Sequence, residues 1–253
     1  MFVGPFNNVR EKMLKGIDSP SLVGTWIKGA DRYGLSERES AWLAGLTFAG
    51  GSDTSAVAMS WWMLAMITYP DIQKRAQAEL DPVVGRTRIP IFSDFQHLPY
   101  IRAMIKEMLR WRPSWPPTSL DDWYDGMFIP QGTVMIANIW HLNRDPTTYG
   151  ADVAHFNPEE GHISYGFGRR VYPGKHVANN SLFIDIAMML WACNIEAGKD
   201  EHGNVIPIDV DGWVEDGLLI HPVPFVADIS PRFPEAVALL TGERELTVER
   251  SVI

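Results

Sequence analysis

The longest apolar stretch of this chain runs from about Ser36 to Tyr69 and predicts one long helix. It opens with the capping-box pattern Ser36-x-x-Glu39, in which each side chain accepts a hydrogen bond from the other residue's backbone N–H. It ends at Pro70, which has no N–H to continue a helix and is typical of the start of a new one. We therefore expect this helix to span about 36–69.

Three further helices are expected where apolar residues recur at helical spacing. The first begins at Asp71, the second spans about 97–111, and the third spans 175–193. Residues 82–95, between the first two, are expected to form a loop.

Short strands are expected in the second half of the chain. Residues 127–129 and 133–136 flank the turn sequence Pro130-Gln131-Gly132 and predict a hairpin. Residues 204–225 predict further short strands, and residues 145–174 are rich in Gly and Pro and predict irregular structure. The expected fold class is therefore mainly α with a small β portion.

The composition adds bounds on function. The chain has 253 residues, 46% hydrophobic and 21% charged, which is typical of a folded globular protein. Its formal net charge of -9 argues against nucleic acid as a partner, because nucleic-acid binding needs a basic face. Cys193 is the only cysteine, so no internal disulfide can form, and we interpret it as a small buried hydrophobic residue.

Neither a signal peptide nor a membrane anchor is expected in this chain. The N-terminus lacks the basic start and apolar core of a signal peptide. Residues 41–69 are apolar, but Asp53 lies near their middle and would cost about 2.5–3.5 kcal/mol in a bilayer. A buried helix is the better interpretation of this stretch.

A glycine pair, an acid and an alcohol lie together inside the long helix. Gly50 and Gly51 each cost a helix about 1 kcal/mol relative to alanine, so they require a reason. One interpretation is that they let a flat or diatomic ligand approach the backbone, while Asp53 and Thr54 relay protons to it. The alternative, slightly favoured by the pattern alone, is that Ser52 or Asp53 caps a second helix after a break.

Two other motifs carry candidate chemistry. Glu107 and Arg110 are spaced i to i+3, so they can pair on one helix face. Residues 165–174 form a glycine-rich loop before the last helix, where backbone N–H groups and two arginines can hold an anionic group. A phosphate-binding loop is the weaker alternative, because the Lys-Ser/Thr of that motif is missing.

In this order, the three motifs resemble those of the cytochrome P450 family, and most closely its fungal monooxygenases. Residues 121–130 and 162–170 carry much of the likeness. The resemblance extends from about Pro5 to Pro224 and corresponds to the family's C-terminal half. It implies one incomplete P450 domain over residues 1–253, without the family's N-terminal anchor and first half.

The resemblance implies a role for each motif. Asp53 and Thr54 would deliver protons to iron-bound dioxygen, and Gly50 and Gly51 would form the oxygen groove. Glu107 and Arg110 would brace the haem-binding core, and Leu218–Ile220 would form a substrate-contacting turn. The remaining cofactor-binding residues would lie in the loop: Tyr165, Gly168, Arg170 as a propionate partner, and Gly174.

The family also implies haem as the cofactor, a small apolar organic substrate and an electron-donating reductase. Its members are usually anchored at the endoplasmic reticulum, whereas this sequence by itself gives no localisation.

The sequence departs from the family at the haem site. The iron-ligating cysteine of the family is replaced by Tyr172, the expected metal position here, and a tyrosinate is a harder ligand than a thiolate. Residues 114–120 lack the usual basic contact to a haem propionate, and the arginine expected after Glu159 to complete the Glu107–Arg110 network is missing. These departures predict that haem is absent or weakly bound.

Three readings follow from these observations. The first is a haem-dependent monooxygenase that is truncated and impaired. The second is a non-catalytic remnant or interaction protein that does not bind haem stably. The third is an incomplete product that leaves apolar helix faces such as residues 56–67 exposed.

Overall fold

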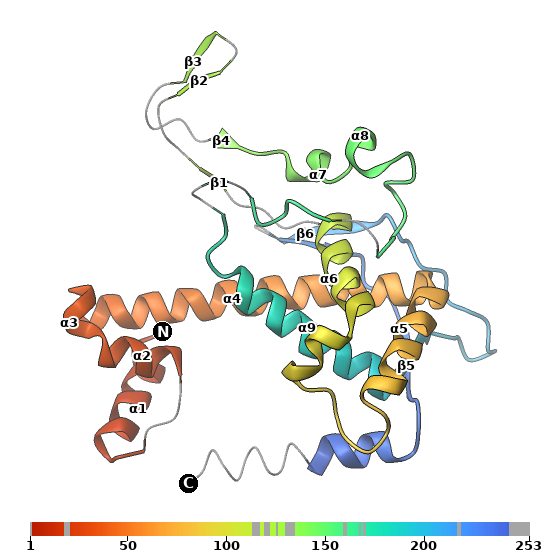
Figure 1. The fold of residues 1–253 in the computed structure, drawn as a ribbon, viewed down its shortest axis with the longest axis horizontal. Coiled ribbons are helices and arrows are strands. Elements are labelled where there is room, and N and C mark those ends of the chain that lie inside the picture. Colours follow the sequence, from red (N-terminus) through yellow and green to blue (C-terminus); the bar gives the residue numbers. More distant parts are fainter. Residues whose placement is uncertain are drawn as a thin grey trace. The chain divides into compact units, whose positions relative to one another are not determined.

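The computed structural model describes residues 2–17, 21–112, 117–118, 122–124, 126–129, 135–158, 161–166, 168, 171–216 and 219–242. The chain forms two compact units, residues 1–54 with 240–253 and residues 55–239 (Figure 1). The expectation of one P450 domain over the whole chain stays a prediction.

Helices build the first unit: α1 (Val3–Leu14), α2 (Leu22–Lys28), α3 (Ala30–Tyr33) and the first part of α4 (Glu37–Thr68). Phe6 of α1 is buried against Ala41 and Ala44 of α4, and half-buried residues of α2 complete this small core. No helix was predicted over residues 1–35, because their apolar positions are too few to show a clear helical period.

The start of α4 confirms the capping box. The N–H of Ser36 donates to Glu39 Oε2 at 2.8 Å, and the N–H of Glu39 donates to Ser36 Oγ at 3.3 Å. The predicted limits of about 36–69 agree with Glu37–Thr68 to within a residue.

The second unit contains the helices α5 (Pro70–Val83), η1 (Phe92–His97, a 3-10 helix), α6 (Pro99–Trp111), α7 (Ile139–Leu142), α8 (Pro146–Tyr149) and α9 (Lys175–Ala192). In Figure 1, α6 and α9 lie side by side, and α5 also packs on α9.

The predicted loop over 82–95 is partly wrong, since α5 continues to Val83 and η1 begins at Phe92. The core includes fully buried Trp62, Met104 and Trp191.

The strands pair as separate two-stranded antiparallel sheets. They are β1 (Pro117–Thr118) with β4 (Met135–Ile136), β2 (Asp122–Tyr124) with β3 (Met127–Ile129), β5 (Cys193–Ala197) with β8 (Ala227–Pro231), and β6 (Trp213–Asp216) with β7 (Leu219–Pro222).

The hairpin predicted for residues 127–136 is wrong. Residues 127–129 pair instead with β2, the strand that precedes them in the chain. The turn between the two strands contains Gly126 at φ +76°, a conformation suited to glycine. Met135–Ile136 pair instead with β1. The strands expected within 204–225 are confirmed as β6 and β7.

The last helix ends one residue earlier than expected, and Cys193 begins β5 instead. Two buried glutamines of α5 hold this strand. Gln73 exchanges two hydrogen bonds of 2.8 Å with the backbone of Ile195, and Gln77 donates to the carbonyl of Cys193 at 3.0 Å.

In the part of the chain that the structure describes, no helix has both the length and the apolar character needed to cross a membrane.

Candidate functional site

An ion pair on α6 lies at the centre of the second unit. Glu107 is 0% exposed and Arg110 is 1% exposed. Arg110 Nε and Nη2 donate to the two carboxylate oxygens of Glu107, each at 2.7 Å. This two-point geometry fits the planar guanidinium and makes a strong pair. The spacing predicted that these two side chains can pair on one helix face, and in the structure this pair is buried rather than a solvated surface pair.

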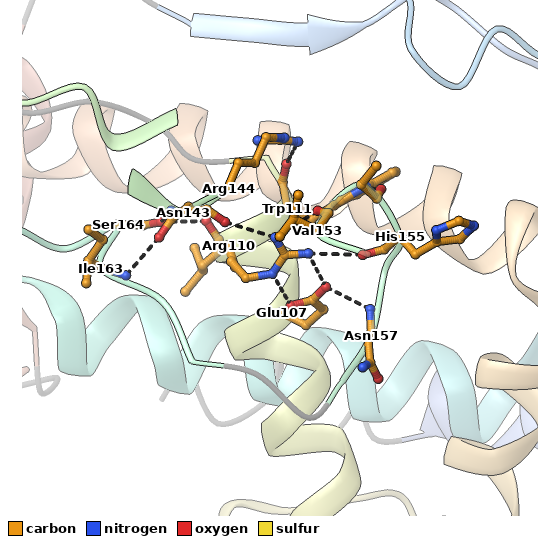
Figure 2. Close-up of polar contacts among 12 residues, drawn as sticks. Glu107, Arg110, Trp111, Asn143, Arg144, Val153, His155, Asn157, Ile163 and Ser164 are labelled. Atoms are coloured by element: carbon orange, nitrogen blue, oxygen red, sulfur yellow. Dashed lines mark hydrogen bonds and ion pairs between the residues drawn. The ribbon is translucent and has the colours of Figure 1, made fainter. Parts of the chain in front are cut away.

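Backbone groups complete the network around this pair (Figure 2). Arg110 Nη1 donates to the carbonyls of Asn143 and Val153, and Nη2 also donates to the carbonyl of His155, all at 2.9–3.0 Å. The N–H of Asn157 donates to Glu107 Oε1 at 2.7 Å. Every N–H of the guanidinium thus has an acceptor.

Whether the missing arginine weakens this network stays a prediction. We expected the network to lack a partner after Glu159, which lies outside the described residues. Among the described residues, both carboxylate oxygens of Glu107 and every N–H of the Arg110 guanidinium have partners, several of them from the backbone between Asn143 and Asn157.

A buried asparagine connects this network to the glycine-rich loop. Asn143 is 0% exposed; its Nδ2 donates to Ser164 Oγ at 2.7 Å and its Oδ1 accepts from the N–H of Ile163 at 3.0 Å. Ser164 Oγ donates in turn to the carbonyl of Leu109 on α6. Sequence reasoning missed Asn143 and Ser164, since isolated polar residues in irregular segments give no periodic signal.

The backbone of the loop is a tight turn before α9. Gly166 and Gly168 take φ values of +71° and +64°, a region that favours glycine. The N–H of Tyr172 donates to the carbonyl of Tyr165 at 2.8 Å and closes the turn. Arg170, the expected propionate partner, lies outside the described residues.

The side chain of Tyr172 folds back over the turn. A Cβ placed on Gly174 would lie 2.6 Å from the Tyr172 hydroxyl oxygen, so only glycine fits at 174 beside this rotamer. Tyr172 is 37% exposed, and its ring centre lies 5.8 Å from that of Tyr165. Burial, followed by the proximity of Tyr172, raises the pKa of Tyr165, whose hydroxyl donates to Asn179 Oδ1 at 2.7 Å.

The glycine pair belongs to the first unit. α4 continues through Gly50 and Gly51, so the interpretation of a break capped by Ser52 or Asp53 is wrong. Thr54 Oγ1 donates to the carbonyl of Gly50 at 2.6 Å, a bond by which hydroxyl residues are tolerated inside helices. A Cβ on Gly50 or Gly51 would meet nothing within 4 Å, and Asp53 is exposed.

Near β7, the predicted substrate-contacting turn is only partly described. Leu218 lies outside the described residues, whereas Leu219 and Ile220 belong to β7. The carbonyl of Ile220 accepts a hydrogen bond from Trp61 Nε1 on α4 at 2.9 Å, which attaches this strand to the helix. Of residues 114–120, only Pro117 and Thr118 are described, so the expected lack of a basic contact there stays a prediction.

Two arginines beside the network stack on tryptophans. The guanidinium carbon of Arg112 lies 4.6 Å from the ring centre of Trp61, and that of Arg144 lies 3.5 Å from the ring centre of Trp140. Burial, then repulsion by Arg112 and Arg110, lowers the pKa of Arg144 to about 10. These stacked cations pack the outer side of the Glu107–Arg110 network and were not identified from the sequence.

The comparisons with known proteins decide the family. The model of the family described as cytochrome P450 matches residues 20–226, which is well over half of the chain. The chain belongs to the cytochrome P450 family. A cytochrome P450 monooxygenase of Armillaria gallica is 57% identical over 97% of this P450 chain and 52% of its own length. The cytochrome P450 monooxygenase iboC of Amanita muscaria is 38% identical over 96% of this chain and 55% of its own.

A solved structure agrees with this assignment. A zebra fish cytochrome P450 described with abiraterone matches 79% of this chain and 50% of its own, with 28% identity and a TM-score of 0.70. This P450 chain therefore spans about half the length of the relatives that it matches. The expected fold, a partial P450 that is mainly α with small sheets, is confirmed.

The residues of the loop do not fit a thiolate-ligated haem. At the position where the resemblance predicts the family's cysteine sulfur, Tyr172 offers a phenol oxygen that is turned against Gly174. Cys193 cannot replace it, because it follows α9, an 18-residue helix about 27 Å long that starts at the loop. Burial also raises the pKa of the Cys193 thiol. The loop backbone keeps a tight, glycine-dependent turn, and its donor set lacks the sulfur.

Proposed function

We propose that this chain is the haem-loop half of a cytochrome P450 monooxygenase fold that has lost thiolate-dependent oxygen activation. One observation supports the proposal: the hydroxyl of Tyr172, at the position where we predict the metal ligand, lies against Gly174. A thiolate pushes electron density onto iron and favours O–O cleavage, and a phenol oxygen is a poor substitute for it.

The residues around the loop are consistent with a chain that keeps its fold while it has lost the oxygen chemistry. The buried Glu107–Arg110 network and its link to the loop through Asn143 are complete, so the loop has its structural support. Asp53 and Thr54 keep the residue types of the proton relay, and we regard them as relics of it. A complete family member would take a small apolar organic substrate and electrons from a reductase, and we propose that this chain uses neither productively.

The test is a titration of the purified chain with haemin, followed by reduction and addition of carbon monoxide. We compare the wild type with Tyr172→Phe, which removes the only donor atom at the position, and with Tyr172→Cys, which restores the sulfur. The wild type and Tyr172→Phe are expected to behave alike and to give no thiolate-type ferrous–carbonyl spectrum. Tyr172→Cys is expected to give that spectrum.

Two results would contradict the proposal. Stoichiometric haemin uptake that is lost in Tyr172→Phe would make the tyrosine a true ligand. A Tyr172→Cys chain that gains no thiolate-type spectrum would show that the donor at position 172 is not by itself what prevents haem chemistry in this chain.

A further inference from the structure

A cavity of about 330 Å³ lies on the second unit, where η1, α6, the segment before the glycine-rich loop and the start of α9 meet. Its charged and polar lining consists of Arg102, Lys106, His162, Tyr165 and Asn179. Among the described residues no Asp or Glu lines it, although the chain as a whole has a formal net charge of -9. Its volume is at the small end of the range for ligand pockets.

The polar groups of this cavity are mainly donors. Nε of Arg102 is buried without a hydrogen-bond partner among the described residues. The N–H of Ser164 donates to His162 Nδ1 at 3.2 Å, so the neutral ring carries its proton on Nε2. Asn179 Oδ1 is already occupied by the Tyr165 hydroxyl, which leaves the amide N–H₂ group of Asn179 as a donor.

Burial and the charge of Lys106 lower the pKa of His162 to about 4, so this ring is a neutral donor at ordinary pH. Lys106 is exposed at the edge and supplies a positive charge. A buried N–H without an acceptor is costly, and an anion inside the cavity would remove that cost for Arg102.

The rest of the lining is apolar and includes Phe95, Pro99, Ala103 and Ile105. Phe95 is held edge-on against Phe183 of α9 at 4.9 Å between ring centres. The Arg102 guanidinium carbon lies 5.3 Å from the centre of the same ring. An apolar wall thus lies beside the guanidinium, which suits a ligand with one charged end and a flat apolar body.

We propose that this cavity binds a small organic carboxylate, whose anionic group Arg102 and Lys106 hold while its apolar body lies against Phe95. The carboxylate supplies the acceptors that the lining lacks. Tyr172 is not among the residues that line the cavity.

The test is calorimetric titration of the full chain with benzoate and, separately, with benzyl alcohol, its neutral counterpart, at constant ionic strength. We expect one benzoate per chain and at least about tenfold weaker binding of benzyl alcohol. Arg102→Met keeps an apolar stem and removes the cation, and Lys106→Met does the same at the exposed edge. Each is expected to weaken benzoate binding, Arg102→Met by about tenfold or more.

Lys74→Met is the matched control, because Lys74 is an exposed helix cation that does not line the cavity. It is expected to bind benzoate as the wild type does. Equal affinity for benzoate and benzyl alcohol, no benzoate binding at about 10 mM, or equal affinities of Lys106→Met and Lys74→Met would overturn the proposal. The ligand comparison and Lys106→Met keep the test decisive if Arg102→Met does not fold.

Discussion

Arg110 depends on backbone carbonyls as much as on its carboxylate partner. Three of its acceptors are backbone carbonyls of the segment between Asn143 and His155. These carbonyls are fixed in the backbone, so they cannot move to keep their hydrogen bonds with a shorter side chain. The position therefore requires the guanidinium shape as well as the charge.

Arg110→Lys is predicted to destabilise the chain by about 3–5 kcal/mol, because one ammonium group cannot replace the five hydrogen bonds that the guanidinium donates to Glu107 and to three backbone carbonyls. Urea unfolding followed by circular dichroism measures the change. Lys74→Met, which breaks an exposed pair with Asp71, serves as the control and should cost less than about 1 kcal/mol. A cost below about 1 kcal/mol for Arg110→Lys would mean that the network is not needed for folding.

His162 predicts a specific loss of stability in mild acid. Its pKa is lowered from the usual 6.5 to about 4 by burial and then by Lys106, so between these values the unfolded chain binds more protons. The contribution of neutral His162 to the free energy of unfolding is therefore fully present above about pH 6.5. It is lost as the pH falls toward 4, and about 2 kcal/mol of it is lost at pH 5.

Urea unfolding at pH 7 and pH 5 tests this, with His162→Gln as the variant that cannot titrate. The loss between the two pH values should be smaller in His162→Gln by about 2 kcal/mol. His202→Gln, at an exposed turn, should show the wild-type loss. Equal losses in His162→Gln and the wild type would mean that His162 is protonated in the folded chain.

At the scale of elements, α4 shows that two glycines need not break a helix. Nothing lies within 4 Å of a Cβ on Gly51, whereas a Cβ on Gly45 would overlap the ring of Phe2. Gly45 and Gly51 therefore differ in their surroundings, although both lie in α4. Gly45 permits close packing, and Gly51 has no packing reason in the described residues.

Gly51→Ala is predicted to raise stability by about 0.5–1 kcal/mol, because alanine reduces the freedom of the unfolded chain without a clash. Gly45→Ala should lower it, since Phe2 must move. Thermal unfolding of both variants checks the two signs. A stabilising Gly45→Ala together with a destabilising Gly51→Ala would reverse this assignment.

The elements differ in how far the sequence predicted them. The capping box and Pro70 predicted the limits of α4, and apolar residues at helical spacing predicted α6 and α9. The hairpin over 127–136 failed because two turn signals lie close together and local sequence does not say which strands pair. Asn143 could not be predicted, because its role depends on contacts between segments about twenty residues apart.

The same limit applied to the site. The motifs identified Glu107 and Arg110, but the sequence suggested that their network was short of a partner. The structure provides backbone partners that have no side-chain signature. The ligand position was predicted from the order of the motifs, whereas the turn of the Tyr172 side chain toward Gly174 is visible only in the structure.

At the scale of the whole molecule, this chain spans about half the length of its P450 relatives. A failure to bind haem could then arise from the donor at 172 or from the half that the relatives add. A chimera separates these causes. It joins the N-terminal half of the Armillaria gallica monooxygenase, which is 57% identical to this chain where the two match, to this chain.

The decisive measurement is the reduced carbon monoxide spectrum of this chimera with Tyr172 and with Tyr172→Cys. Our account predicts a thiolate-type spectrum for the Tyr172→Cys chimera and none for the chimera that keeps the tyrosine. The account would be contradicted if the tyrosine chimera gave a thiolate-type spectrum or if the two chimeras gave the same one.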